Sequence, residues 1–175
     1  PDRYIILLAA CLINLCLGSI YAWSVFAAPM AAHLGLDAGD LAVVFIVVNS
    51  VGPVTMIFGG TIVRKVGAGW VIRIGGLMFG LGIFCSGFSG SLGALIVWYS
   101  LVGGLGLGMA YGCTITNTLG FFPDKRGLMG GVLTAVYGLS SVIVPPVANA
   151  LISSFGVLTA FRVIGAAEGI QHGGL

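Results

Sequence analysis

Long apolar runs are the feature that most constrains how this chain can fold. A helix needs about 20 apolar residues to cross the hydrocarbon core of a bilayer. Five runs of about that length, at residues 4–28, 41–63, 70–88, 92–121 and 127–153, are separated by short links with turn residues such as Pro29 and Pro123. The sequence therefore predicts an all-α membrane protein with five complete spans and the start of a sixth from Leu158.

The composition agrees with lipid as the main surroundings of this chain. Of 175 residues, 58% are hydrophobic and 7% are charged, against roughly 25% charged residues in soluble domains. The 30 glycines would weaken helices in water, whereas in a bilayer small residues let helix backbones approach closely. We therefore expect the lipid bilayer to cover most of the protein's surface.

The sixth apolar run is shorter and more polar than the others. Glu168 interrupts it, and the chain then reads Gly169-Ile170-Gln171-His172-Gly173-Gly174-Leu175. We expect residues 1–165 to form one helical half-bundle. We expect residues 166–175 to be a truncated or non-native tail, so that the sixth segment does not cross the membrane.

The basic residues indicate the orientation of the spans. Six of the seven fall on one side of an alternating topology: Arg3, Arg64, Lys65, Arg73, Lys125 and Arg126. Arg162 is the exception. Because Lys and Arg concentrate in cytoplasmic loops, we expect a cytoplasmic N-terminus and a multi-pass location in the plasma (inner) membrane.

Polar residues within the spans recur at helical spacing and so share faces. Asn14, Gly18 and Tyr21 share one face, and Asn49 and Pro53 share another. Two further stripes are Tyr111, Thr114 and Thr118, with Asn117 beside them, and Thr134, Tyr137 and Ser141. These stripes indicate a hydrated cavity bordered by spans one, two, four and five. The alternative is that these groups only bond neighbouring helices, as such residues often do.

Three glycines in the fourth span, Gly104, Gly108 and Gly112, form a doubled GxxxG pattern. The pattern predicts close helix packing. A nucleotide-binding interpretation lacks the preceding strand and the acidic residue that such a site needs. We expect no nucleic acid among the partners.

The first five spans have no ionisable residue near their centres, where a proton relay or a catalytic carboxylate would stand. The four cysteines lie in apolar runs without a CxxC pattern. We therefore expect no catalytic residues, no metal site and no cofactor, and a protein that is not an enzyme.

Three stretches carry a resemblance to a known family. They are Tyr21 to Pro29, Gly59 to Gly67, and Gly104 to Gly112 followed by Asn117 and Phe121 to Gly127. In these stretches the chain resembles the major facilitator superfamily, and within it the oxalate/formate antiporter group. The resemblance implies the N-terminal six-helix half of a two-half transporter, with its sixth helix truncated and its C-terminal half as the missing partner.

The resemblance also implies a substrate and a site. It implies a secondary transporter that exchanges small organic anions, of the oxalate and formate type, by alternating access. Aromatic residues that match Tyr21, Tyr111 and Tyr137 wall the family's substrate site, and we add Asn14 and Asn117 from the polar faces. The cationic residues that pair with the anion lie in the family's second half. A transporter of a neutral or cationic solute, or a non-transporting membrane subunit, remains an alternative.

The link after the second span stands where the family has its signature loop, here with Gly60, Arg64, Lys65 and Gly67. The family has an acidic residue where Arg64 stands and a basic one where Gly69 stands. Because that acidic group helps latch the two halves together, this departure puts the usual gating contact in question. Arg64 and Lys65 would instead favour contact with anionic lipid.

Overall fold

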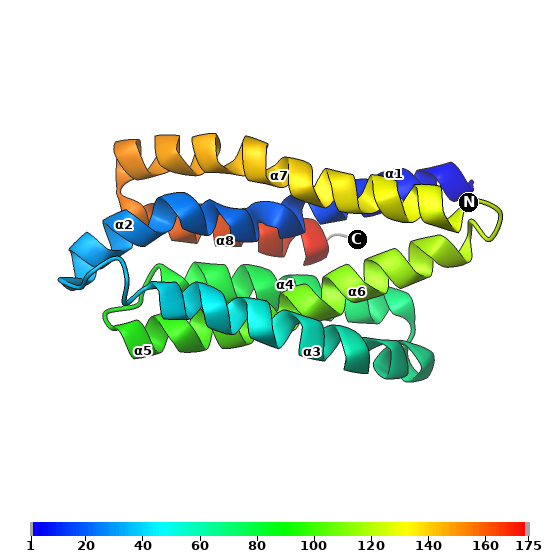
Figure 1. Cartoon of the computed structure of the whole chain (residues 1–175), viewed down its shortest axis with the longest axis horizontal. Coiled ribbons are helices and arrows are strands. Elements are labelled where there is room, and N and C mark those ends of the chain that lie inside the picture. Colours follow the sequence, from blue (N-terminus) through cyan, green and yellow to red (C-terminus); the bar gives the residue numbers. More distant parts are fainter. Residues whose placement is uncertain (1, 174–175) are drawn as a thin grey trace.

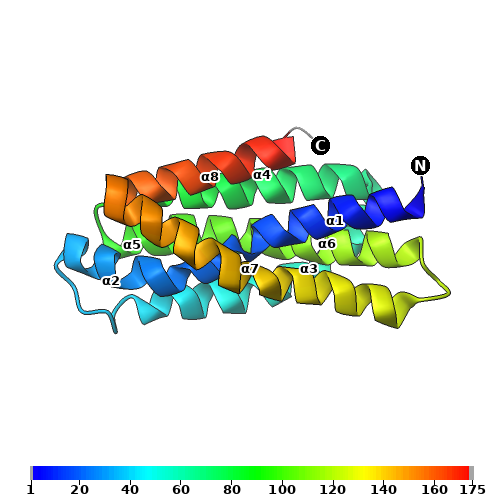
Figure 2. The same cartoon turned by 90° about the horizontal axis from the view of Figure 1, so that it is seen from above.

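The computed structural model describes residues 2–173, and within that range the chain forms helices and no strand. The elements are α1 (Arg3–Leu17), the 3₁₀ segment η1 (Gly18–Ala22), α2 (Trp23–Leu34), α3 (Ala42–Val66), α4 (Ala68–Ser86), α5 (Leu92–Leu95), the π-helical segment η2 (Ile96–Gly103), α6 (Gly104–Gly120), α7 (Arg126–Phe155) and α8 (Val157–Gly173). Because α1, η1 and α2 are continuous, as are α5, η2 and α6, six rods lie side by side in an elongated bundle (Figures 1 and 2).

Large apolar side chains cover much of the outside of this bundle. Ile46 is 62% exposed, Val142 67% and Leu8 63%. By length and composition, four helical segments among the described residues can cross a membrane, Arg3–Leu34, Ala68–Ser86, Leu92–Gly120 and Arg126–Phe155, and the apolar stretch Ala42–Phe58 is shorter. Such surfaces suit contact with lipid, since soluble monomers rarely expose large apolar patches.

The first rod differs from the expected span 4–28 in two ways. The helix does not end before Pro29, which lies inside α2, and it continues to Leu34. It ends at Gly35, whose φ of 67° is left-handed and whose N–H bonds back to Ala31 and Ala32. A glycine takes this conformation without strain. The rod also carries the 3₁₀ segment η1, which the sequence pattern did not predict.

The sixth helix is longer than the sequence suggested. The apolar run is interrupted at Glu168, but the helix itself is continuous from Val157 to Gly173. Glu168 does not face lipid at this point: it is 6% exposed, and its carboxyl group lies beside Ser19 of η1. The last residues of the expected tail, 174 and 175, lie outside the described part.

Glycines set the spacing between the central rods. A side chain at Gly104, Gly108 or Gly112 would run into Val48, Gly52 and Thr55, or Met56 of α3. The predicted glycine stripe thus lies against α3. Gly106, on another face of α6, lies against the backbone of Gly75 and Phe79 in α4.

The rods place the basic links together. The N-terminus, the link between α3 and α4, and the link between α6 and α7 all lie at one end of the bundle (Figure 1). There Arg3 forms an ion pair of 3.2 Å with Asp124. The acidic link with Asp37 and Asp40 lies at the opposite end (Figure 1).

Candidate functional site

Three tyrosines from three different rods meet inside the bundle. The ring centroids of Tyr21 on η1 and Tyr137 on α7 are 5.4 Å apart, with an edge-on angle of 62°. Those of Tyr111 on α6 and Tyr137 are 4.5 Å apart, tilted by 43°. Tyr137 therefore joins the other two, and we call these three residues the tyrosine cluster.

A glycine explains why Tyr21 reaches this cluster. An added Cβ at Gly18 would meet the Oγ of Ser140 and the carbonyl oxygen of Tyr137 at 2.7 Å each. Only glycine therefore lets the start of η1 rest against α7 at this distance. The close approach brings Tyr21, three residues later, onto the ring of Tyr137.

The tyrosine cluster borders a cleft of about 220 Å³ between α3, α6, α7 and η1. We call it the tyrosine cleft. The volume lies below the usual range of about 300–1,000 Å³ for ligand pockets, so it suits a ligand of few atoms. Besides the tyrosines, its lining consists of Val48, Asn49, Gly52, Pro53, Met56, Leu107 and Gly108. Spans one, two, four and five supply this lining, as the polar stripes predicted.

The lining offers hydrogen bonds and aromatic edges but no charge. A phenol group can donate or accept a hydrogen bond, and the edge of an aromatic ring is electropositive. The amide nitrogen of Asn49 donates to the carbonyl oxygen of Phe45 at 2.8 Å. No Lys, Arg, Asp or Glu is among the lining residues of the described chain. The cleft can therefore orient a small polar ligand, but this lining does not neutralise its charge.

The two asparagines predicted with the tyrosines lie elsewhere. Asn14 is fully buried on α1 and is not among the residues that line the tyrosine cleft. Asn117 lines a separate cavity of about 150 Å³ between α1, α4 and α6, together with Ile13, Ile72 and Thr114. The structure thus brings together three of the five predicted site residues.

Sequence reasoning missed several residues around the cleft. Val48, Met56 and Leu107 are apolar, and nothing in their type distinguishes a cleft wall from a lipid-facing position. Tyr99 was also missed: its ring lies 4.7 Å from that of Trp23, and its hydroxyl donates to the carbonyl oxygen of Ile20 at 3.2 Å. Tyr99 and Trp23 are both buried and pack on the side of η1 that faces away from the tyrosine cluster.

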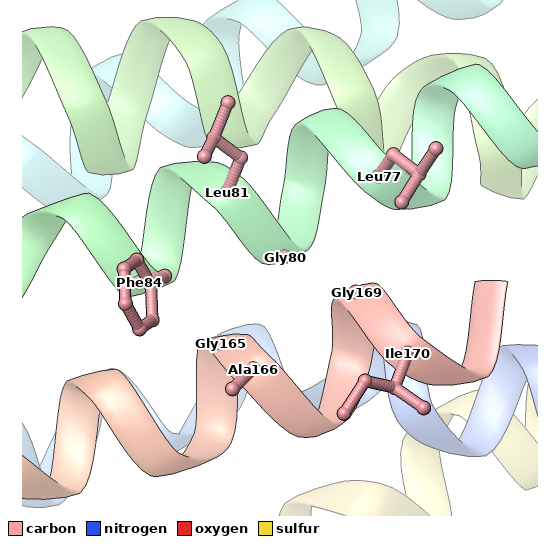
Figure 3. A pocket seen from close by; sticks show the side chains of 8 residues that line it. All are labelled: Leu77, Gly80, Leu81, Phe84, Gly165, Ala166, Gly169 and Ile170. Atoms are coloured by element: carbon pink, nitrogen blue, oxygen red, sulfur yellow. The ribbon is translucent and has the colours of Figure 1, made fainter. Parts of the chain in front are cut away.

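A second groove, of about 330 Å³, runs between α4 and α8 (Figure 3). Its lining consists of Leu77, Gly80, Leu81, Phe84, Gly165, Ala166, Gly169 and Ile170. No polar side chain is among them, so this groove cannot hold a carboxylate through hydrogen bonds. Among the described residues, no group of three His, Cys, Asp or Glu side chains is placed to hold a metal ion.

Comparison with known proteins identifies the family. The sequence model of the Major Facilitator Superfamily matches residues 7–170, nearly the whole chain. The chain belongs to the Major Facilitator Superfamily. The all-α bundle is accordingly the architecture of one half of this superfamily's fold, in a multi-pass membrane protein.

Within the superfamily, the relatives are transporters. The chain is 30% identical to the oxalate:formate antiporter of Oxalobacter formigenes, over 95% of this chain and 40% of that protein. It is 26% identical to the uncharacterized MFS-type transporter YhjX of Escherichia coli, over 94% and 41%. It is 28% identical to monocarboxylate transporter 9 of Gallus gallus, over 87% and 30%. These relatives are named as transporters, and the chain spans less than half their length.

The link that we expected to match the superfamily's signature loop is a very short turn between α3 and α4. Gly67 makes the turn with a φ of 90°, and Arg64 and Lys65 are exposed beside it. Arg64 borders a cavity of about 270 Å³ with Val63, Met56, Gly112, Cys113 and Thr116. Gly60 falls within the bounds of α3, and its surroundings lie outside the part of the chain that is described.

Proposed function

We propose that this chain is the first half of a secondary transporter that exchanges small organic anions, with the tyrosine cleft as one wall of the substrate site. The contact of Tyr21, Tyr111 and Tyr137 around a cleft of about 220 Å³ is the observation that carries this proposal. Relatives named as an oxalate:formate antiporter and as monocarboxylate transporters support the substrate class.

Transport by alternating access needs a second half that closes the cleft from the other side. The cleft's lining carries no charge, so the cations that neutralise a carboxylate would come from that second half. In this arrangement the tyrosines hold and orient the substrate, and the other half supplies the electrostatic attraction. No cofactor, metal ion or nucleic acid takes part.

The distribution of charge supports the membrane placement that we propose. The end of the bundle with Arg3, Arg64 and Lys65 would face the cytoplasm, because positive residues are retained on that side. The protein would thus lie in the plasma (inner) membrane with its N-terminus inside. A cysteine introduced at Asp37, at the opposite end, should react with a membrane-impermeant thiol reagent added from outside the cell. If this cysteine does not react, the proposed orientation is wrong.

Reconstitution of the complete transporter in proteoliposomes tests the site. Tyr137 contacts both partner rings, and each aromatic pair contributes about 0.5–1.5 kcal/mol. These contacts hold Tyr21 and Tyr111 beside the cleft, so Tyr137→Leu, which removes both, should raise the half-saturation constant for labelled oxalate or formate roughly ten- to hundredfold. Tyr137→Phe keeps both ring contacts and should raise the constant less. Tyr4→Leu is the matched control, since Tyr4 is 58% exposed and lies outside the cleft. Equal exchange kinetics for Tyr137→Leu and the control would reject the site.

The uncharged lining of the cleft also favours a second candidate, a small neutral solute carried by the same fold. Competition separates the two. Unlabelled carboxylates should inhibit exchange in the first case, and their uncharged amides should not. Inhibition by the amides alone would replace the anion with a neutral substrate.

A further inference from the structure

A polar cluster lies between α1, η1 and α8, outside the tyrosine cleft. It contains Cys16, Ser19, Glu168 and Gln171. The Sγ of Cys16 donates to the Oε1 of Gln171 at 2.6 Å. The hydroxyl of Ser19 lies beside the carboxyl group of Glu168 without completing a hydrogen bond. Glu168 is 6% exposed and Ser19 3%, so these two groups are buried, whereas Cys16 and Gln171 are half-buried at the edge of the cluster.

Burying the carboxyl group of Glu168 at this position costs free energy. An ionisable side chain within a membrane bundle costs several kcal/mol when charged, and such residues usually mark a functional path. The family match extends to residue 170 and so includes this position. None of the mechanism proposed for the tyrosine cleft uses Glu168.

Helix α8 cannot easily move away from this cluster. On another face it packs backbone to backbone on α4, where an added Cβ at Gly80 would lie 2.5 Å from the amide nitrogen of Gly169. An added Cβ at Gly165 would likewise run into the backbone of Phe84 and Gly80, on the facing helix (Figure 3). Because α4 holds α8 in place, a change in the charge of Glu168 acts on the neighbouring side chains that face it, among them Ser19 of η1.

That segment carries part of the proposed substrate site. Ser19, which meets Glu168, stands two residues before Tyr21 in the same 3₁₀ segment. Tyr21 in turn contacts Tyr137. The buried carboxyl group is thus connected to the tyrosine cluster through one short backbone segment, from Ser19 to Tyr21.

Other titratable groups lie on the helices that pack against α8. Cys16 on α1 is close enough to Glu168 for an electrostatic interaction between the two side chains. On α8 itself, Arg162 is engaged with the carbonyl oxygen of Gly87 at 3.1 Å and with the ring of Phe88. The remaining titratable residues of these helices are Arg3, Tyr4 and Cys11 on α1, His33 on α2, Arg73 and Cys85 on α4, and Arg126 and Tyr137 on α7.

We propose that Glu168 is a proton-binding site whose occupancy changes substrate affinity through Ser19 and Tyr21. The inference rests on the proposed function, since it needs a substrate at the tyrosine cleft. One proton from the solvent binds a carboxylate oxygen of Glu168 and leaves in the reverse step. The carboxylate can only accept a hydrogen bond from the Ser19 hydroxyl, whereas the protonated acid can donate one to it. The position of Ser19 and η1 therefore depends on this proton, and by linkage substrate and proton alter each other's affinity equally.

Binding of labelled oxalate to the complete transporter in nanodiscs tests this site between about pH 5.5 and 8.5. Carboxyl groups exposed to water, with pKa values near 4, stay ionised throughout this range. They therefore do not contribute a pH dependence of their own. For one linked proton, the dissociation constant should change by up to tenfold per pH unit. Glu168→Gln keeps the size of the side chain and should make the constant independent of pH. Glu168→Asp keeps a titratable group and should retain the dependence. A pH indicator in weakly buffered solution should report up to one proton bound or released per substrate, and none in Glu168→Gln.

Control variants replace, one at a time, the cysteine of this cluster and the two histidines of the chain. Cys16→Ala, His33→Gln and His172→Gln should all keep the pH dependence. The inference is overturned if Glu168→Gln follows the wild-type curve, if a histidine variant abolishes it, or if the wild type binds oxalate with no pH dependence. Absence of carboxylate binding at every pH would instead contradict the proposed function itself.

Discussion

The contact between α4 and η2 gives a sharp test of how closely these rods are packed. An added Cβ at Gly82 would lie 2.6 Å from both the carbonyl oxygen of Trp98 and the amide nitrogen of Gly103, and 2.8 Å from the Cα of Gly103. Ordinary contacts begin at 3.4 Å, so Gly82→Ala would be roughly 0.8 Å too close on several sides. All three neighbours are backbone atoms, and no side chain can rotate away to make room.

The helices must then separate, and overpacking of this kind costs about 1–3 kcal/mol. In lipid no hydrophobic gain offsets that loss, because lipid tails are as apolar as the side chains. We expect Gly82→Ala to lower the midpoint of thermal unfolding in detergent by several degrees, measured by size-exclusion chromatography after heating. Gly69→Ala is the matched control: Gly69 lies on the same helix, and nothing lies within 4 Å of its added Cβ. Equal midpoints for the two variants would refute the packing argument.

Two further substitutions test other sources of stability with the same measurement. Gly67→Ala meets no neighbour, but the φ of 90° would strain any other residue, so we expect a loss of about 1–3 kcal/mol from backbone strain alone; a midpoint unchanged from wild type would show that the turn can adopt another conformation. Ser100→Ala removes a buried hydroxyl that donates to the carbonyl oxygen of Val44 at 2.6 Å, and we expect a loss of about 0.6 kcal/mol, typical of such bonds between membrane helices. A Ser100→Ala defect as large as that of Gly82→Ala would show that this hydrogen bond between η2 and α3 stabilises the bundle as much as the glycine contact between α4 and η2 does.

The sequence was most informative where a periodic pattern had one physical cause. A glycine every fourth residue predicted the close face of α6, because only glycine admits a neighbouring backbone there. Tyrosines at helical spacing predicted that Tyr21, Tyr111 and Tyr137 share inward faces. The same logic failed for Asn14 and Asn117, since a shared face does not fix the depth at which a side chain meets the other helices.

Apolar length and glycine placement by themselves determined that this is a bundle of membrane helices, because only continuous helices can satisfy their backbone groups in lipid. Tertiary contacts decided the rest. The 3₁₀ segment η1 is positioned by Gly18 on Ser140 and by Tyr99 behind it. Glu168 is buried because α8 packs into the bundle, where it lies beside Ser19, 149 positions away in the chain. Sequence period describes one helix at a time, whereas the burial of a polar residue depends on which other helix lies against it.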